Sequence, residues 1–247
     1  MFGDLFHCHY GVGGYDTSTS SRSSDIYRLN EDALVYNEDE LASISVNSSN
    51  MWLCCVAGLR TGRSHHSCIA YQDKIWVVGG ITRDSVYAGK LVELLNPVDG
   101  TCEAGPDVIT PRFSPHLLIL DDILFCIGGD MVGHVRCIGS IERFDPLTCA
   151  WQHEATFPMK RTKCSVFSYN DRIYVFGGSN PADPYTMTTW DYYCIKTKRW
   201  ASTTQSTTND AHQQYDCDLI HKLGSLRGRD KGIICTKAVV LDYSAIC

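Results

Sequence analysis

The stretch Arg172–Gly178, RIYVFGG, is an apolar segment that runs directly into two glycines. Similar stretches occur at Lys74–Gly80, at Ile123–Gly129 and, in a weaker form, at His9–Gly14. The intervals between the second glycines of these pairs are 66, 49 and 49 residues. A sequence period of about 50 residues indicates a repeat architecture, in which each repeat is one supersecondary unit that stacks on its neighbours.

Other residues keep the same period. Sixteen residues after the second glycine of each pair stand Asn30, Asn96, Asp145 and Cys194. Six residues further on, the last three repeats have Cys102, Trp151 and Trp200, whereas Trp52 of the first repeat comes sixteen residues late. An arginine lies sixteen residues before each of the later glycine pairs, at Arg63, Arg112 and Arg161. This spacing predicts one common unit, with an insertion in the first copy.

Each unit divides into four short strands. Strand A is expected at His66–Tyr71, His116–Leu120 and Ser165–Tyr169, and each is followed by a turn that contains aspartate or asparagine. Such residues tolerate the left-handed backbone of tight hairpins. Strand B is the apolar run into the glycines, strand C ends near Leu95 or Phe144, and strand D carries the tryptophan. Four short antiparallel strands in a regular repeat predict one blade of a β-propeller.

The residues also carry a family resemblance. The order Arg112…His116, an apolar strand, a glycine pair, Glu142–Pro146 (ERFDP) and Trp151 resembles the kelch repeat. The match covers about Arg63–Trp200, and the first unit shares only its later part. The resemblance implies an all-β fold, a kelch-type β-propeller of about four blades with four antiparallel strands each, which could be an incomplete propeller.

The expected organisation is a single propeller region over residues 1–247. It consists of a divergent first blade at 1–62 with an acidic insertion at 31–51, blade two at 63–102, blade three at 103–151, blade four at 152–200 and a degenerate partial repeat at 201–247. The last residues, Ala238–Cys247, match Leu117–Cys126 position for position. Two interpretations stay open: this strand completes the first blade, or the chain is a truncated product of a longer kelch protein.

Composition and charge limit the partners and the cellular compartment that we expect for this chain. The formal net charge of −6 gives no support for a surface that binds nucleic acid or anionic membrane. The first residues show no signal peptide, so we expect a cytoplasmic protein. The thirteen cysteines show no disulfide framework. We expect reduced thiols, with Cys68, Cys126 and Cys164 as small hydrophobic residues inside strands.

The candidate site is a set of loops. In a propeller, the D–A loops with the arginines and the B–C loops after the glycines open on the same face. Arginine binds carboxylates through two parallel hydrogen bonds. The resemblance to kelch substrate adaptors implies partner contacts at Arg63, Arg112, Arg161, Tyr15 and Ser179, with Ile81 and Asp130 as weaker candidates. The alternative is that each arginine bridges neighbouring blades through backbone carbonyls.

No catalytic motif, cofactor site or metal site is expected. His7 and His9 would supply at most two ligands, while a structural zinc ion needs four. The resemblance implies a non-catalytic protein–protein interaction module, similar to the substrate-recognition domain of a cullin-RING ubiquitin ligase adaptor. It would bind a protein or peptide partner, and a cullin only if a longer form has a BTB domain. The alternative is a cytoskeletal, actin-binding or scaffold kelch protein.

Overall fold

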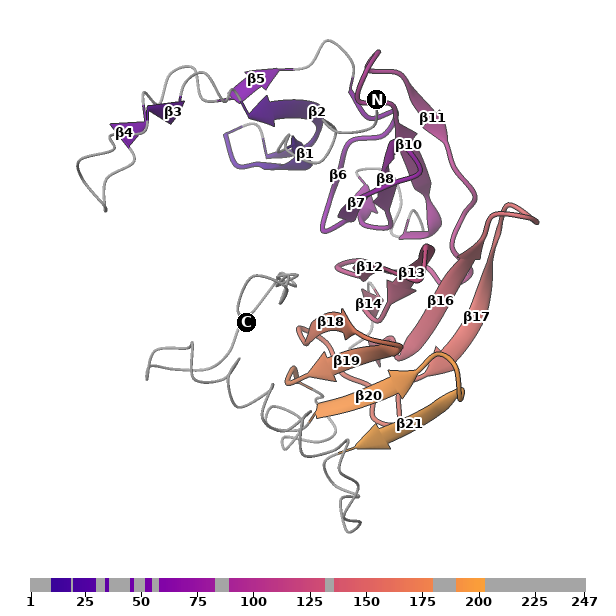
Figure 1. Ribbon diagram of the computed structural model, residues 1–247. Coiled ribbons are helices and arrows are strands. Elements are labelled where there is room, and N and C mark those ends of the chain that lie inside the picture. Colours follow the sequence, from indigo (N-terminus) through magenta and orange to yellow (C-terminus); the bar gives the residue numbers. More distant parts are fainter. Residues whose placement is uncertain are drawn as a thin grey trace. The chain divides into compact units, whose positions relative to one another are not determined.

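The computed structural model describes residues 10–18, 20–29, 34–35, 45–46, 52–54, 58–82, 89–131, 136–179 and 190–202. The chain divides into two compact units, Met1–Phe157 and Pro158–Cys247. In the described residues the regular structure is β-strand, apart from one short 3-10 turn at Gly89 and Lys90, and Figure 1 shows the strands in chain order. No helix in these ranges has the length and hydropathy needed to span a membrane.

Four antiparallel sheets follow one another along the chain. The first has three strands in the order β1 (Tyr10–Asp16), β2 (Ser21–Leu29) and β5 (Trp52–Cys54). Three sheets of four strands follow. The second is β7 (Ser67–Tyr71), β8 (Lys74–Val78), β10 (Val92–Leu95) and β11 (Cys102–Ala104). The third is β12 (His116–Leu120), β13 (Ile123–Ile127), β16 (Ser140–Asp145) and β17 (Ala150–Thr156). The fourth is β18 (Ser165–Tyr169), β19 (Arg172–Phe176), β20 (Trp190–Cys194) and β21 (Arg199–Ser202).

Each four-stranded sheet pairs its strands in sequence order, from A to D, as expected of a propeller blade. We call the four sheets blades one to four. The all-β prediction is confirmed, and the four strands per blade are confirmed for blades two, three and four. Short two-stranded ribbons complete the described structure: β3 (Leu34–Val35) with β4 (Ser45–Val46), β6 (Arg63–Ser64) with β9 (Ile81–Thr82), and β14 (Asp130–Met131) with β15 (Arg136–Cys137).

The hairpins between strands A and B are as tight as the sequence indicates. Gln72 and Asp73 have φ angles of 49° and 60°, and Asp121 and Asp122 have φ angles of 51° and 58°. Two successive left-handed residues form the type I′ turn whose twist matches that of the flanking strands. In the turn of blade four, Asn170 has a left-handed φ angle of 49°.

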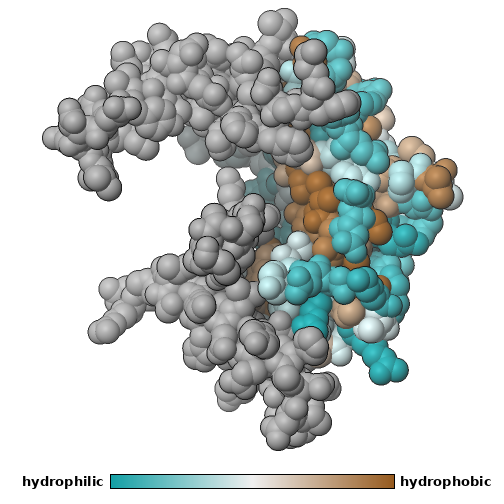
Figure 2. Space-filling view, viewed as in Figure 1, coloured by the Kyte–Doolittle hydropathy of each residue, from teal (hydrophilic) through white to brown (hydrophobic). Residues whose placement is uncertain are grey.

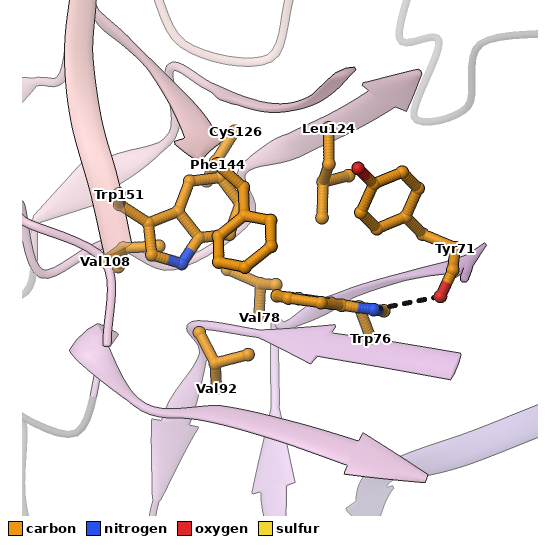
Figure 3. Packing of buried hydrophobic residues seen from close by; sticks show 9 residues of the cluster. All are labelled: Tyr71, Trp76, Val78, Val92, Val108, Leu124, Cys126, Phe144 and Trp151. Carbon is orange, nitrogen blue, oxygen red and sulfur yellow. Dashed lines mark hydrogen bonds between the residues drawn. The ribbon is translucent and has the colours of Figure 1, made fainter. Parts of the chain in front are cut away.

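The contact between blades two and three is aromatic. Trp76 of β8 packs against Phe144 of β16 with ring centroids 4.7 Å apart, and Trp151 of β17 lies 6.3 Å from Trp76. Figure 3 shows these rings with Tyr71 and the aliphatic side chains around them. The polar edges of the rings are satisfied, because the Trp76 indole donates to the Tyr71 carbonyl at 3.0 Å and the Trp151 indole to the Pro106 carbonyl at 2.9 Å. This layer fixes the two blades against each other.

Among the described residues, the contact between blades one and two is aliphatic. Ile26 of β2 packs with Leu59, Ile75, Val77 and Leu95. Hydrogen bonds cross the same contact: the Leu59 N–H donates to the Ser24 carbonyl at 2.7 Å. No aromatic ring belongs to this described cluster.

The cysteines differ from one prediction. Cys126 and Cys164 are buried, as expected, but Cys68 is exposed, so its assignment to the core was wrong. The reason is the alternation of β7, in which Cys68 and Ala70 face outward.

Figure 2 shows hydrophobic residues gathered in one area of the face in view, with polar residues over most of the other coloured surface.

Several predictions fall outside the described residues. They concern His7 and His9, most of the acidic insertion at 31–51, and the partial repeat beyond residue 202. They stay predictions.

The aromatic layer gives a first test. Replacing Trp76 with alanine should lower the free energy of unfolding by about 3–5 kcal/mol, because the change removes a buried ring and leaves a cavity. Urea unfolding followed by circular dichroism measures this. Leu147→Ala is the control, since Leu147 is 95% exposed and its loss should change stability by less than about 0.5 kcal/mol. Equal effects of the two substitutions would contradict the assignment of the layer.

Candidate functional site

The loops predicted to form the site do lie together within each blade. We call residues 58–66, 105–115 and 158–164, which enter strand A of blades two, three and four, the connectors. Each connector pairs with the loop after the glycine pair of the same blade. Arg63 and Ser64 pair with Ile81 and Thr82. Phe113 forms a β-bridge with Asp130, and Thr162 forms one with Ser179.

This pairing requires the second glycine of each pair. Gly129 has a φ angle of 99°, and a Cβ atom at this position would lie 2.7 Å from the Phe113 carbonyl oxygen. Gly178 shows the same features, with a φ angle of 89° and 2.5 Å to the Thr162 carbonyl oxygen. Only glycine lacks the atom that would clash and also adopts this backbone without strain.

The three connector arginines are buried. Arg63, Arg112 and Arg161 have 0%, 1% and 1% of their surface exposed. Each Nη1 donates to the carbonyl of the first glycine of its own blade: to Gly79 at 3.1 Å, Gly128 at 2.9 Å and Gly177 at 3.3 Å. Each Nε donates to the carbonyl two residues upstream, at Thr61, Thr110 or Met159.

A buried carboxylate on strand C completes each arrangement. Arg63, Arg112 and Arg161 form ion pairs with Glu93, Glu142 and Asp191, and every one of these side chains is at most 5% exposed. The acid stands thirty residues after its arginine in all three blades. This regular spacing could have revealed the pairs in the sequence, and it was missed.

The carboxylates also hold the connector backbone. Glu142 accepts the N–H groups of Ile109 at 2.9 Å and Thr110 at 3.1 Å. Glu93 accepts the N–H of Arg60 at 2.7 Å and the thiol of Cys102 at 3.2 Å. Burial, followed by the hydrogen bond to Glu93, raises the pKa of the Cys102 thiol to about 11, so the thiol stays protonated and donates.

The backbone of Arg112 faces the preceding blade. Its N–H donates to the Gly89 carbonyl and its carbonyl accepts the Gly80 N–H, both at 3.0 Å. Its side chain is bonded to Gly128, Ser140 and Glu142 of blade three. One residue therefore connects blades two and three, which is the bridging alternative considered from the sequence.

Comparison with known proteins agrees with this geometry. The model of the Kelch motif matches residues 111–158, which contain Arg112, the glycine pair, Glu142 and Trp151. Residues 111–158 carry a Kelch motif, and the chain is similar to kelch-repeat proteins. Its repeats are divergent, since the identity to the kelch relative that covers most of the chain is 24%.

Three relatives show the kinds of protein to which the chain is similar. The Kelch repeat protein M-T8 of Myxoma virus is 24% identical over 84% of this chain and 36% of its own length. The Kelch repeat and BTB domain-containing protein 1 of Cowpox virus is 23% identical over 69% of this chain and 27% of its own. Alpha-scruin of Limulus polyphemus is 25% identical over 47% of this chain and 13% of its own. The chain thus spans about a third or less of the length of these relatives.

The predicted site residues differ in their exposure to solvent. Tyr15 is 53% exposed near the end of β1, where it pairs with Arg22 of β2, and Ser179 is half-buried beside Thr162. Both stay candidates for partner contact. The side chains of Arg63, Arg112 and Arg161 are at most 1% exposed, so the proposed contact surface does not include them. Of the weaker candidates, Ile81 and Asp130 take part in the loop pairing.

Three exposed residues were not predicted as a set. His65, Ser114 and Lys163 each stand two residues after a kelch arginine and have φ angles of 57°, 50° and 53°. Left-handed backbone is uncommon outside glycine and is concentrated at functional positions. His65 lies edge-to-face against Phe113 at 6.2 Å, and its carbonyl accepts the Ser114 N–H at 2.6 Å. Their common spacing from the arginines was the available signal.

Among the residues that the structure describes, no group of three or more histidine, cysteine, aspartate or glutamate side chains is placed to hold a metal ion.

The arginine–carboxylate pair gives a second test. Arg112→Met should destabilise the domain by about 3–5 kcal/mol, because it leaves the Glu142 carboxylate buried without its cation. The double variant Arg112→Met/Glu142→Leu should stay clearly less stable than the wild type, since the carbonyls and N–H groups that the pair satisfies lose their partners. Urea unfolding measures both.

The matched control is Lys74→Met/Glu103→Leu, which removes a pair that is 39% and 60% exposed. Exposed pairs contribute at most about 1 kcal/mol. A Glu142 double variant as stable as the wild type would show that the pair is replaceable by hydrophobic packing.

Proposed function

We propose that this kelch-repeat domain binds a short acidic or turn-forming segment of a protein partner through the exposed residues of its connectors and adjoining turns. Kelch repeats are protein–protein interaction modules, and the finer assignment rests on the connectors. The contact residues proposed are, for each unit taken by itself, Tyr15, His65 and Ser114 in the first and Lys163 and Ser179 in the second.

The observation that carries the proposal is the separation of roles within each connector. The arginine is buried and hydrogen-bonded to carbonyls and to a carboxylate, while the residue two positions later is exposed on a left-handed backbone. A loop whose backbone is fixed by buried hydrogen bonds presents its exposed side chains with little conformational freedom. Such pre-organisation lowers the entropy cost of binding a partner.

In a longer protein with a BTB domain, this module would select the substrate of a cullin-RING ubiquitin ligase. This proposal is supported by the Cowpox virus relative, whose name includes a BTB domain. The competing proposal is a cytoskeletal or scaffold role, in which the same connectors bind a filament protein. Affinity capture with the full-length product separates the two, because the first requires a cullin in the complex and the second requires filament proteins without a cullin.

The connector surface gives a third test. Lys163→Glu should weaken binding of an acidic partner segment roughly tenfold and reduce the salt dependence of association, since it reverses an exposed charge at the proposed contact. The measurement is a titration of the captured partner segment at two salt concentrations.

Lys198→Glu is the matched control. Lys198 is also exposed and also has a left-handed backbone, with a φ angle of 58°, but it lies in the turn between β20 and β21. Its reversal should leave the affinity unchanged. If both reversals weaken binding equally, or if neither does, the connector is not the contact surface.

A further inference from the structure

We propose that His66 is an acid-sensitive latch, which holds blade one against blade two and releases it when the imidazole ring becomes protonated. The inference concerns the first unit alone and does not depend on the identity of a partner.

The ring lies in the contact between the two blades. Its Nε2 is 2.8 Å from the Val12 carbonyl oxygen of β1. A carbonyl can only accept, so Nε2 carries the proton and donates. The ring also lies close to the chain of blade one, because a Cβ atom on Gly13 would be 3.0 Å from the His66 Cε1. The imidazole therefore takes part in the contact as a neutral group.

The other ring nitrogen is unsatisfied. Nδ1 is buried and has no hydrogen-bond partner. Protonation of Nδ1 would create a buried cation whose new N–H has no acceptor, which is costly in a site shielded from water. The neutral ring fits the closed contact and the charged ring does not.

Among the surrounding groups, Arg63 and His65 act in the same direction and Glu93 acts against it. Arg63 and His65 lie on the same segment as His66, and Glu93 lies on β10. On the side of blade one, Arg22 donates to Ser64 at 3.3 Å. Burial is the main cause and Arg63 the second of a His66 pKa lowered from 6.5 to about 4, while the Val12 hydrogen bond and Glu93 oppose the shift.

The latch is specific to this connector. The position three residues after the arginine is His66 in blade two, Pro115 in blade three and Cys164 in blade four. Each of them lies against the second glycine of its blade, at Gly80, Gly129 or Gly178. Only His66 can gain a proton as the pH falls below neutrality. The contact that carries it is also the one without aromatic packing in the described residues.

The direction of the effect follows from linkage. A group whose pKa is lower in the closed state stabilises that state above its ordinary pKa, and the stabilisation is lost as the pH falls from 6.5 toward 4. With these two values, the equilibrium constant for opening the contact should rise roughly 20-fold between pH 7 and pH 5.

Amide hydrogen exchange in the intact chain tests this directly. The Leu59 N–H, which donates to the Ser24 carbonyl, reports separation of blades one and two. After correction for intrinsic rates, its opening constant should rise roughly 20-fold from pH 7 to pH 5. The Val108 N–H, which donates to the Lys90 carbonyl, lies between blades two and three and should not change.

Two variants separate the latch from general acid sensitivity. His66→Gln should abolish the pH dependence at Leu59, and His65→Gln, which alters the exposed neighbour, should preserve it. A wild-type change of less than threefold, or an equal dependence in His66→Gln, would overturn the proposal. If His66→Gln does not fold, nuclear magnetic resonance titration of the wild-type ring decides: a pKa near 4 supports the latch, and one of 6 or above overturns it.

Discussion

The buried arginine–carboxylate pair is the interaction on which the rest of each four-stranded blade depends. Removing two charges from water costs several kcal/mol per ion, and the mutual attraction offsets this only where the remaining donors and acceptors are also satisfied. Blade three meets that condition: Arg112 bonds three carbonyls as well as Glu142, and the Glu142 carboxylate accepts two connector N–H groups. The pair therefore holds the backbone of the connector in place and is more than an isolated salt bridge.

The buried ion pair explains how one loop can contain both residues that recur in each four-stranded blade and residues that differ between these blades. With the arginine held inside, the connector pairs with the strand after the glycines, and that pairing needs the absence of a Cβ at Gly129 or Gly178. The chain then turns outward two residues after the arginine. The framework residues are buried in blades two, three and four, while the exposed residue differs between these blades as His65, Ser114 and Lys163. The side chain at this position can therefore vary without loss of the fold.

The sequence predicted the strands well because periodicity and turn residues act locally. The apolar runs into the glycines and the aspartate turns lie where they were expected. The arginines were placed in the correct loops, but spacing from the glycines does not say what surrounds a side chain. Their burial depends on acids thirty residues away on strand C, which the spacing of the arginines from the glycines does not indicate. The prediction that Cys68 is buried was wrong for a similar reason, because an apolar run does not reveal which alternate positions face outward.

The two contacts within the first unit show how one framework can hold blades with different strength. Blades two and three share the Trp76, Phe144 and Trp151 layer, and large aromatic rings contribute both buried area and specific ring geometry. Blades one and two share aliphatic side chains and the His66 hydrogen bond. A contact of the second kind has less apolar stabilisation and includes a group that can become charged. Local opening of the first unit should therefore begin between blades one and two, since opening follows the contact with the lowest free energy.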